Sequence, residues 1–382
     1  MKTLIDENTD YRDYFVERLV AHGYRERIAK TDYDKRFAFD TEELLAFLKD
    51  TQPEQMAELA KIHQERVNEV IIAQINQAII HGGLIETLKS SVEINGVPLK
   101  LIFSKPATSY NQTLGELYHK NRFTVMKEVT IDESSRVDLV LFVNGIAVIS
   151  CELKSEYSRQ TYRNAIHQYG YNRDPMNRLF LFKAGTVVNF AMDLNEVYMT
   201  TKLNGPETKF LPFNRGNGEG VKTGAGNPLD DGSKDYPVHY MWDDVLLPDS
   251  LVELLMSFCF TIREQKENPD TGEKTQSEKL IFPRYHQRDA VRKLLNDVYN
   301  NGTKLNYLIQ HSAGSGKTNT ICWLAHRLSS LHDAFDKQIF DNVLIITDRL
   351  VVDQQLQKAV KSIDHQPGLI RAIGEEQGDD SS

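Results

Sequence analysis

The sequence is poor in cysteine and contains no long hydrophobic run. Its 382 residues include only three cysteines, Cys151, Cys259 and Cys322, which lie far apart and form no CxxC pair. Neither a disulfide framework nor a cysteine zinc site is therefore expected. No apolar stretch approaches the roughly 20 residues that a membrane helix needs, and the polar, acidic start lacks the layout of a secretory signal. These absences predict a soluble, cytoplasmic protein with no membrane partner.

The sequence also lacks the excess of positive charge that gives general affinity for nucleic acids. It has 45 Lys and Arg against 54 Asp and Glu, and a net charge of −9. The stretch from Lys154 to Lys183 is an exception, because basic residues outnumber acidic ones there and alternate with tyrosines. This stretch is either a phosphate-facing strip or a solvated helix face.

The length of the chain suggests two domains, and the hydrophobic pattern divides it accordingly. Apolar residues at helical spacing predict helices at 11–22, 41–50, 54–81, 157–170 and 247–262. Runs of β-branched and aromatic residues predict strands at 98–104, 123–131, 136–143, 146–154, 179–194 and 196–203. A long segment without regular secondary structure is expected at 204–236, and a polar linker at 264–279. We therefore expect an α/β protein with domains at 1–246 and 280–382, joined by a helix and polar linker at 247–279.

Three charged residues interrupt two of the apolar strands. Asp138 lies near the start of the first strand, Glu152 and Lys154 near the end of the second, and Asn144-Gly145 is a hairpin turn between them. A hairpin of this length places Asp138 beside Glu152, and residues two apart on a strand share a face. Unpaired carboxylates in apolar strands are costly, which favours a functional site. A buried structural ion pair of Lys154 with one carboxylate is the competing interpretation.

These three residue types suit metal-dependent cleavage of a phosphodiester. Two carboxylates, Asp138 and Glu152, can hold Mg²⁺, and Lys154 can orient a water molecule or neutralise charge in the transition state. The pattern resembles that of PD-(D/E)xK nucleases, although Val137 stands where their proline usually lies. The resemblance implies a catalytic triad of these residues in a central mixed sheet flanked by helices.

A second element follows the triad. The segment AIHQYGY, from Ala165 to Tyr171, resembles the A-x-x-Q…Y element that follows ExK in type I restriction R subunits and RecB-like nucleases. The resemblance implies a catalytic role for Gln168 together with a tyrosine. The usual spacing is QxxxY, and the distance from Gln168 to Tyr171 is one residue shorter. We assign Tyr171, with Tyr169 as the alternative; an ordinary amphipathic helix with packed aromatics is also open.

A glycine loop lies in the second domain between an apolar run at 307–311 and a helical segment. Such a loop directs backbone N–H groups and a helix N-terminus at the phosphates of ATP. Lys317 would reach the β and γ oxygens, and Thr318 would bind Mg²⁺. His311 replaces the first glycine of the usual motif, as in superfamily 2 helicases and translocases, which the loop resembles. The loop residues assigned to ATP are Gly314, Ser315, Gly316, Lys317 and Thr318.

Two neighbouring segments extend that resemblance. Arg284–Val291 is similar to the R-x-x-Q-x-x-A-V element of the superfamily, in which Gln287 would pair with adenine; a simple helix start is the alternative. Residues 343–349 are similar to the strand and turn that carry motif Ia. No Asp-Glu pair follows Thr318. We therefore expect an incomplete RecA-like motor lobe, truncated before the DEAH-type motif, which would not hydrolyse ATP alone.

In this order, the two sites resemble the N-terminal part of the type I restriction enzyme R subunit over essentially the whole chain. The resemblance implies Mg²⁺-dependent cleavage of double-stranded DNA, ATP-driven translocation, and assembly with methylation (M) and specificity (S) subunits. Two alternatives remain open: a stand-alone helicase–nuclease of DNA repair, and a non-catalytic DNA-binding or assembly fragment.

Overall fold

The computed structural model describes most of the chain, as two compact units. The first unit is Met1–Pro106 with Asn111–Cys259, and the second is Ala107–Tyr110 with Phe260–Ser382. Among the described helices, none has the length and apolarity needed to cross a lipid bilayer. The described residues are 11–133, 135–155, 159–217, 226–228, 232–267, 274–347, 356–357 and 360, with no side chains described within 264–275.

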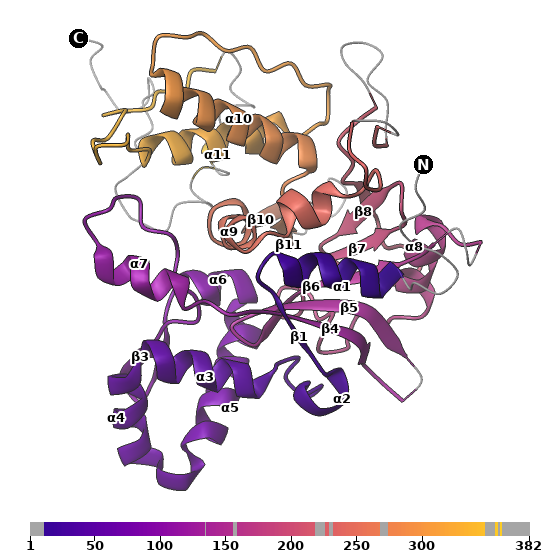
Figure 1. The fold of residues 1–382 in the computed structure, drawn as a ribbon, viewed down its shortest axis with the longest axis vertical. Helices are drawn as coiled ribbons and strands as arrows, with labels where there is room; N and C mark the ends of the chain where they lie inside the picture. Colours follow the sequence, from indigo (N-terminus) through magenta and orange to yellow (C-terminus); the bar gives the residue numbers. More distant parts are fainter. Residues whose placement is uncertain are drawn as a thin grey trace. The chain divides into compact units, whose positions relative to one another are not determined.

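A seven-stranded mixed sheet forms the centre of the first unit (Figure 1). In spatial order its strands are β1 (Arg25–Arg27), β4 (Phe123–Thr130), β5 (Arg136–Val143), β6 (Ile146–Leu153), β7 (Val188–Met192), β8 (Val197–Thr200) and β9 (Leu211–Pro212). The pairs β1–β4 and β6–β7 are parallel, and the other neighbours are antiparallel. The predicted α/β class is confirmed for this unit.

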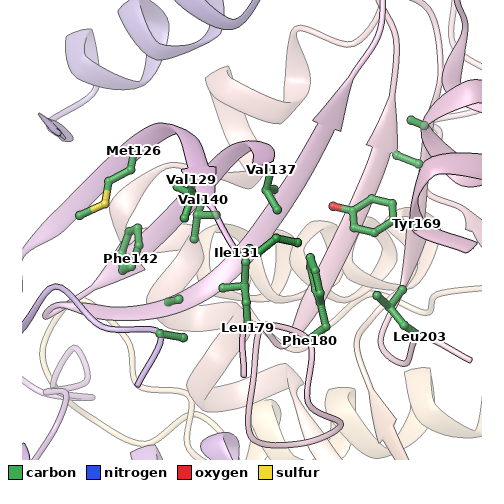
Figure 2. Close-up of a cluster of buried hydrophobic side chains, with 14 residues drawn as sticks. Met126, Val129, Ile131, Val137, Val140, Phe142, Tyr169, Leu179, Phe180 and Leu203 are labelled. Carbon is green, nitrogen blue, oxygen red and sulfur yellow. The ribbon is translucent and has the colours of Figure 1, made fainter. Parts of the chain in front are cut away.

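The hairpin of β5 and β6 lies in the buried centre of this sheet. Every residue of β6 is buried, and continuous apolar runs of this kind are typical of strands covered on both faces. Figure 2 shows part of the core, in which Val137 and Val140 of β5 lie among Ile131, Leu179 and Phe180. The antiparallel pairing of β5 with β6 confirms the predicted hairpin.

The turn of this hairpin is fixed by its own two residues. Asn144 and Gly145 both have positive φ, at 50° and 78°, as two-residue hairpin turns require. A Cβ on Gly145 would lie 2.3 Å from the Asp40 carbonyl oxygen, so only glycine fits. The Asn144 side chain accepts from Arg122 N and donates to Leu101 O, which ties the turn to neighbouring loops.

Helices surround this sheet, and α3, α4 and α5 pack in succession (Figure 1). The helices of the unit are α1 (Tyr11–Ala21), α2 (Ala29–Asp32), α3 (Thr41–Thr51), α4 (Pro53–His63), η1 (Gln64–Arg66), α5 (Val67–Gly82), α6 (Leu84–Lys89), α7 (Gln112–His119), α8 (Tyr162–Tyr171), η4 (Met241–Val245), α9 (Pro248–Glu253) and η5 (Leu254–Phe258). A separate small hairpin consists of β2 (Val92–Ile94) and β3 (Val97–Leu99). The helices predicted at 11–22, 41–50 and 54–81 are confirmed.

Three predicted elements are shorter than expected. Only Pro98 and Leu99 of the apolar run at 98–104 lie in a strand, and 247–262 is helical only to Phe258. The run at 179–194 becomes a strand at Val188, because a tight turn closed by the Thr186 N–H to the Leu179 carbonyl precedes it. The predicted helix at 157–170 begins at Tyr162; its residues 157 and 158, and part of the long segment at 204–236, lie outside the described residues.

Among its described residues, the second unit contains one strand pair and two long helices. They are β10 (Phe260–Glu267), β11 (Lys274–Ile281), α10 (Tyr285–Asn301) and α11 (Lys317–Ser329). β10 and β11 pair antiparallel from Phe260 opposite Ile281 to Glu267 opposite Lys274. The predicted polar linker at 264–279 thus contains paired strand residues at both of its ends, and its role as a domain linker stays a prediction. Backbone pairing needs no apolar side chains along its length, and the buried Phe260 anchors the pair at one end.

The strands expected on either side of the glycine loop helix are not formed. Residues 307–311 and 343–347 have no strand assignment, and Leu308 and Ile346 are 89% and 84% exposed. A strand requires a paired neighbour, and neither segment is paired within the part of the chain that is described. The sheet of a RecA-like lobe is thus absent from the described residues. Asp348 and Arg349 of the predicted motif Ia turn lie outside them.

Candidate functional site

The hairpin of β5 and β6 brings the three predicted nuclease residues together. Leu139 pairs with Cys151, which places Asp138 beside Glu152. Oδ2 of Asp138 accepts a hydrogen bond of 2.8 Å from Leu153 N and lies 3.7 Å from Nζ of Lys154. The two carboxylates and the amine therefore share one edge of the hairpin.

Glu152 is a fully buried carboxylate with one oxygen satisfied and one not. Its Oε1 accepts from Nε and Nη2 of Arg173 at 2.8 and 2.6 Å. Its Oε2 is buried and has no hydrogen-bond partner. Burial and then the charge of Asp138 raise the pKa of Glu152 to about 8, against the opposing effect of Arg173. Arg173 alone therefore does not offset the cost of burying ionised Glu152 beside Asp138.

This imbalance fits a divalent cation. A hard cation beside Asp138 and Glu152 would neutralise the repulsion between them and could satisfy the free oxygen of Glu152. In the described portion of the chain, no third His, Cys, Asp or Glu completes a metal-binding group. Mg²⁺ commonly takes one or two carboxylates and fills its other positions with water and substrate phosphate oxygens. The residues present fit such a site.

Two arginines missed by the sequence reasoning support these carboxylates. Nη1 of Arg12, in α1, lies 2.6 Å from Glu128 and 3.9 Å from Asp138. Arg173 follows α8 and is 3% exposed. Arg12 carries no signal in the sequence, because its partners lie more than a hundred residues away. Arg173 belongs to the basic stretch from Lys154 to Lys183, but the sequence pattern did not show that its side chain points inward.

The basic stretch does not form one phosphate-facing strip. Arg173 faces inward to Glu152, and Arg178 donates to Asn76 Oδ1 and Ala184 O at 2.9 and 2.7 Å. Burial lowers the pKa of Arg178 to about 10. A continuous strip and a fully solvated face are both excluded, since two of the basic side chains are bound within the fold.

The structure separates the two candidate tyrosines. Gln168 lines a pocket together with Lys154 and Arg173. Tyr169 points the opposite way into the core, where its hydroxyl lies 2.7 Å from Ser150 Oγ (Figure 2). Tyr171 is 64% exposed and stacks on the pocket residue His167 with a centroid distance of 4.3 Å. Only Tyr171 is therefore accessible beside this pocket, and its catalytic role stays a prediction.

The glycine loop in the second unit binds its own lysine. Gly314 and Gly316 have φ of 74° and 84°, and α11 begins at Lys317. Nζ of Lys317 donates to the carbonyl oxygens of His311 and Ser312 at 3.0 and 2.9 Å. The amine therefore occupies the inside of the loop, where phosphate oxygens could replace the carbonyl groups. Thr318 lies in the first turn of α11, as expected.

The Gln287 side chain stabilises this loop through hydrogen bonds. Its Nε2 donates to Gly316 O at 2.9 Å and its Oε1 accepts from Arg284 N at 2.8 Å, with only 3% of the residue exposed. A Cβ on residue 316 would lie 2.4 Å from Gln287 Nε2. The positive φ therefore favours glycine at this position, and a larger residue would displace the Gln287 amide from the loop. The predicted contact of Gln287 with adenine stays a prediction, since its amide already bonds the loop.

The described geometry defines an α/β unit with an acidic pair and lysine on adjoining strands, and a second unit with a glycine loop that leads into α11. A family model described as "Type I restriction enzyme R protein N terminus" matches residues 9–208, which is more than half of the chain. The chain belongs to this family. A model described as "Type III restriction enzyme, res subunit" matches residues 280–381.

Two curated relatives come from Methanocaldococcus jannaschii. The MjaVIIIP relative, named as a type I restriction enzyme endonuclease subunit, is 27% identical over 252 residues, or 62% of this chain. The MjaVIIP relative, with the corresponding name, is 28% identical over 255 residues, or 64% of this chain. Each match covers 21% of the relative. The chain thus spans about a fifth of the length of the curated relatives it matches.

Proposed function

We propose that the chain is the nuclease-bearing part of a type I restriction R subunit, and that its first unit cuts double-stranded DNA with Mg²⁺ held by Asp138 and Glu152. The buried, half-satisfied carboxylate of Glu152 beside Asp138 carries the proposal. Bound Mg²⁺ would supply Lewis acidity toward the phosphodiester and a more acidic water molecule. Family membership favours restriction over a stand-alone repair helicase–nuclease.

The side chains around the acidic pair have separate tasks in this proposal. Lys154, held 3.7 Å from Asp138, orients the attacking water or neutralises charge on the phosphate as the bond breaks. Arg173 fixes Glu152 in one orientation through two hydrogen bonds to the same oxygen. Gln168 positions DNA from the pocket that it shares with Lys154, and Tyr171 acts at its exposed margin.

For the second unit we propose ATP binding at the glycine loop. Lys317 would exchange its two carbonyl partners for phosphate oxygens, and Thr318 would join the Mg²⁺ of the nucleotide. Gln287 would pair with adenine. The match to a restriction res subunit supports this role. Translocation of DNA and assembly with M and S subunits belong to the proposal for the whole R subunit.

The test is cleavage of plasmid DNA by the restriction complex reconstituted with M and S subunits, ATP and Mg²⁺. Asp138→Ala and Lys154→Ala should each lower cleavage by at least a hundredfold and leave ATP hydrolysis unchanged, because they remove groups that act only on the phosphodiester. Lys317→Ala should abolish ATP hydrolysis, and cutting with it.

Lys61→Ala, an exposed lysine on α4, is the matched control and should behave as the unaltered chain. Cleavage that persists in Asp138→Ala and Lys154→Ala would remove the nuclease assignment. Unchanged ATP hydrolysis in Lys317→Ala would remove the assignment of the loop.

A further inference from the structure

A pocket of about 420 Å³ beside the acidic site has a lining that the proposed chemistry uses only in part. Lys154 and Arg173 connect it to Asp138 and Glu152, and Arg136 adds a third positive charge. None of its described lining residues is acidic. A pocket lined by basic and uncharged polar groups next to the reacting groups suits an anionic ligand, and its uncharged lining residues indicate which kind.

Four carboxamide side chains line this pocket in a regular series. They are Gln160, Asn164, Gln168 and Asn172. Asn164 and Gln168 lie one turn apart on α8, whereas Gln160 precedes the helix and Asn172 caps its end, and all four line the same pocket. The eight steps from Asn164 to Asn172 correspond to about 12 Å of helix axis. The series is therefore a line of neutral hydrogen-bonding groups rather than a single cluster.

These carboxamides are available to a ligand. Within the described part of the chain, the side chains of Gln160, Gln168 and Asn172 form no hydrogen bond. Asn164 uses its oxygen to accept from Thr161 N, which leaves its amino group. Each free carboxamide offers two donors and one acceptor.

Arg136 is available as well, because its side chain is 65% exposed and its pair with Glu128 is long, at 3.5 Å. Such exposed ion pairs contribute little and exchange readily.

The lining suits a DNA strand better than a single small anion. One strand carries a phosphate about every 3.4 Å along the helix axis, so a 12 Å line of donors faces roughly three to four nucleotides. Neutral amides can bind phosphate and sugar oxygens along such a repeating ligand, while arginine supplies a charge contact. Lys154 is shared with the acidic site, which places the bound segment next to the reacting bond.

We propose that this pocket binds the sugar–phosphate backbone of the cut strand directly beside the scissile bond, with Arg136 at a phosphate and with Gln160 and Asn172 at the two ends of the bound segment. The inference rests on the proposed nuclease function of Asp138, Glu152 and Lys154. It adds residues that hold the strand without taking part in the chemistry.

The test is binding of a short fluorescent DNA duplex to the 382-residue chain in Ca²⁺, across a series of salt concentrations. Arg136→Gln should weaken binding and lower the slope of log affinity against log salt by about 1, because one phosphate contact is lost. Gln160→Ala and Asn172→Ala should each weaken binding about 3- to 10-fold without changing this slope, because they remove neutral hydrogen bonds.

Matched controls are Arg66→Gln and Gln74→Ala, on exposed positions before and within α5. Thermal unfolding should be the same for all five variants, which separates binding from folding. The inference is overturned if the three pocket variants bind like their controls, or if the unaltered chain does not bind the duplex.

A parallel variant separates this inference from the function on which it rests. Asp138→Ala should fail to cut in the reconstituted complex with Mg²⁺, and this outcome is read independently of the affinity of the pocket variants for the duplex. If Asp138→Ala cuts DNA, the nuclease assignment fails while the binding result at Arg136, Gln160 and Asn172 stands. If it does not cut and the pocket variants bind normally, only the inference fails.

Discussion

The acidic site of the first unit and the glycine loop of the second hold their charged groups by different means. Glu152 depends on Arg173, 21 residues away, and Asp138 is approached by Arg12 from α1. Lys317 instead binds carbonyl groups only five and six residues before it. A change at the acidic site should therefore disturb the fold of its unit, whereas a change at the loop should act locally.

The largest effect that sharpens this comparison is expected from Arg173→Met. Ionised Glu152 would be left buried without its cation, which costs about 3 kcal/mol of unfolding free energy for a broken buried pair. The loss should be clear at pH 9 and smaller at pH 6, where Glu152 holds a proton. Urea unfolding at both pH values measures it.

The control for this change is Arg163→Met, a solvent-facing arginine of α8, which should leave the unfolding free energy almost unchanged. Glu152→Gln in the Arg173→Met background should recover part of the loss, because no buried charge remains. Equal stability of Arg173→Met and Arg163→Met would show that the ion pair does not support the fold.

A smaller effect is expected at the loop from Gly316→Ala. Positive φ and the 2.4 Å approach of Gln287 Nε2 should together cost about 2 kcal/mol. Gly314→Ala, with similar φ and no atom within 4 Å, should cost less. In a Gln287→Ala background the two substitutions should become equal in thermal unfolding. A persistent difference there would mean that Gln287 is not the cause.

The pH dependence of metal binding should show a still smaller effect. The pKa of Glu152 in the folded chain, about 8, lies above its ordinary value of 4.5, so the stability that its proton contributes is present below pH 4.5 and is lost as the pH rises toward 8. A cation must displace this proton, so Mg²⁺ should bind about fivefold more tightly at pH 8 than at pH 7, because the ionised fraction of Glu152 rises by that factor. Calorimetric titration measures this change, and an affinity independent of pH in this range would contradict the raised pKa.

The hairpin was predictable because its information is local. Two continuous apolar runs and the Asn144-Gly145 turn specify β5 and β6. The exact pairing of Asp138 with Glu152 also depends on a register shift between Leu141 and Phe142, which the sequence pattern did not predict. The start of α11 after the glycines was predictable for the same reason. These features need only neighbouring residues to form.

What the sequence could not show depends on contacts between distant segments. The inward direction of Arg173 and the approach of Arg12 follow from how α8 and α1 meet the sheet. The burial of Tyr169 and exposure of Tyr171 likewise depend on which face of α8 is covered. The strand predicted at 307–311 is not formed, because an apolar run alone does not provide a neighbouring strand to pair with.

The most direct measurement is the stoichiometric binding of Mn²⁺, a substitute for Mg²⁺ at oxygen sites, to the chain without nucleotide. The account predicts one bound ion at pH 8, whose affinity falls at least tenfold in both Asp138→Asn and Glu152→Gln. The same affinity and stoichiometry in the unaltered chain and in both variants would contradict a shared metal site on the hairpin.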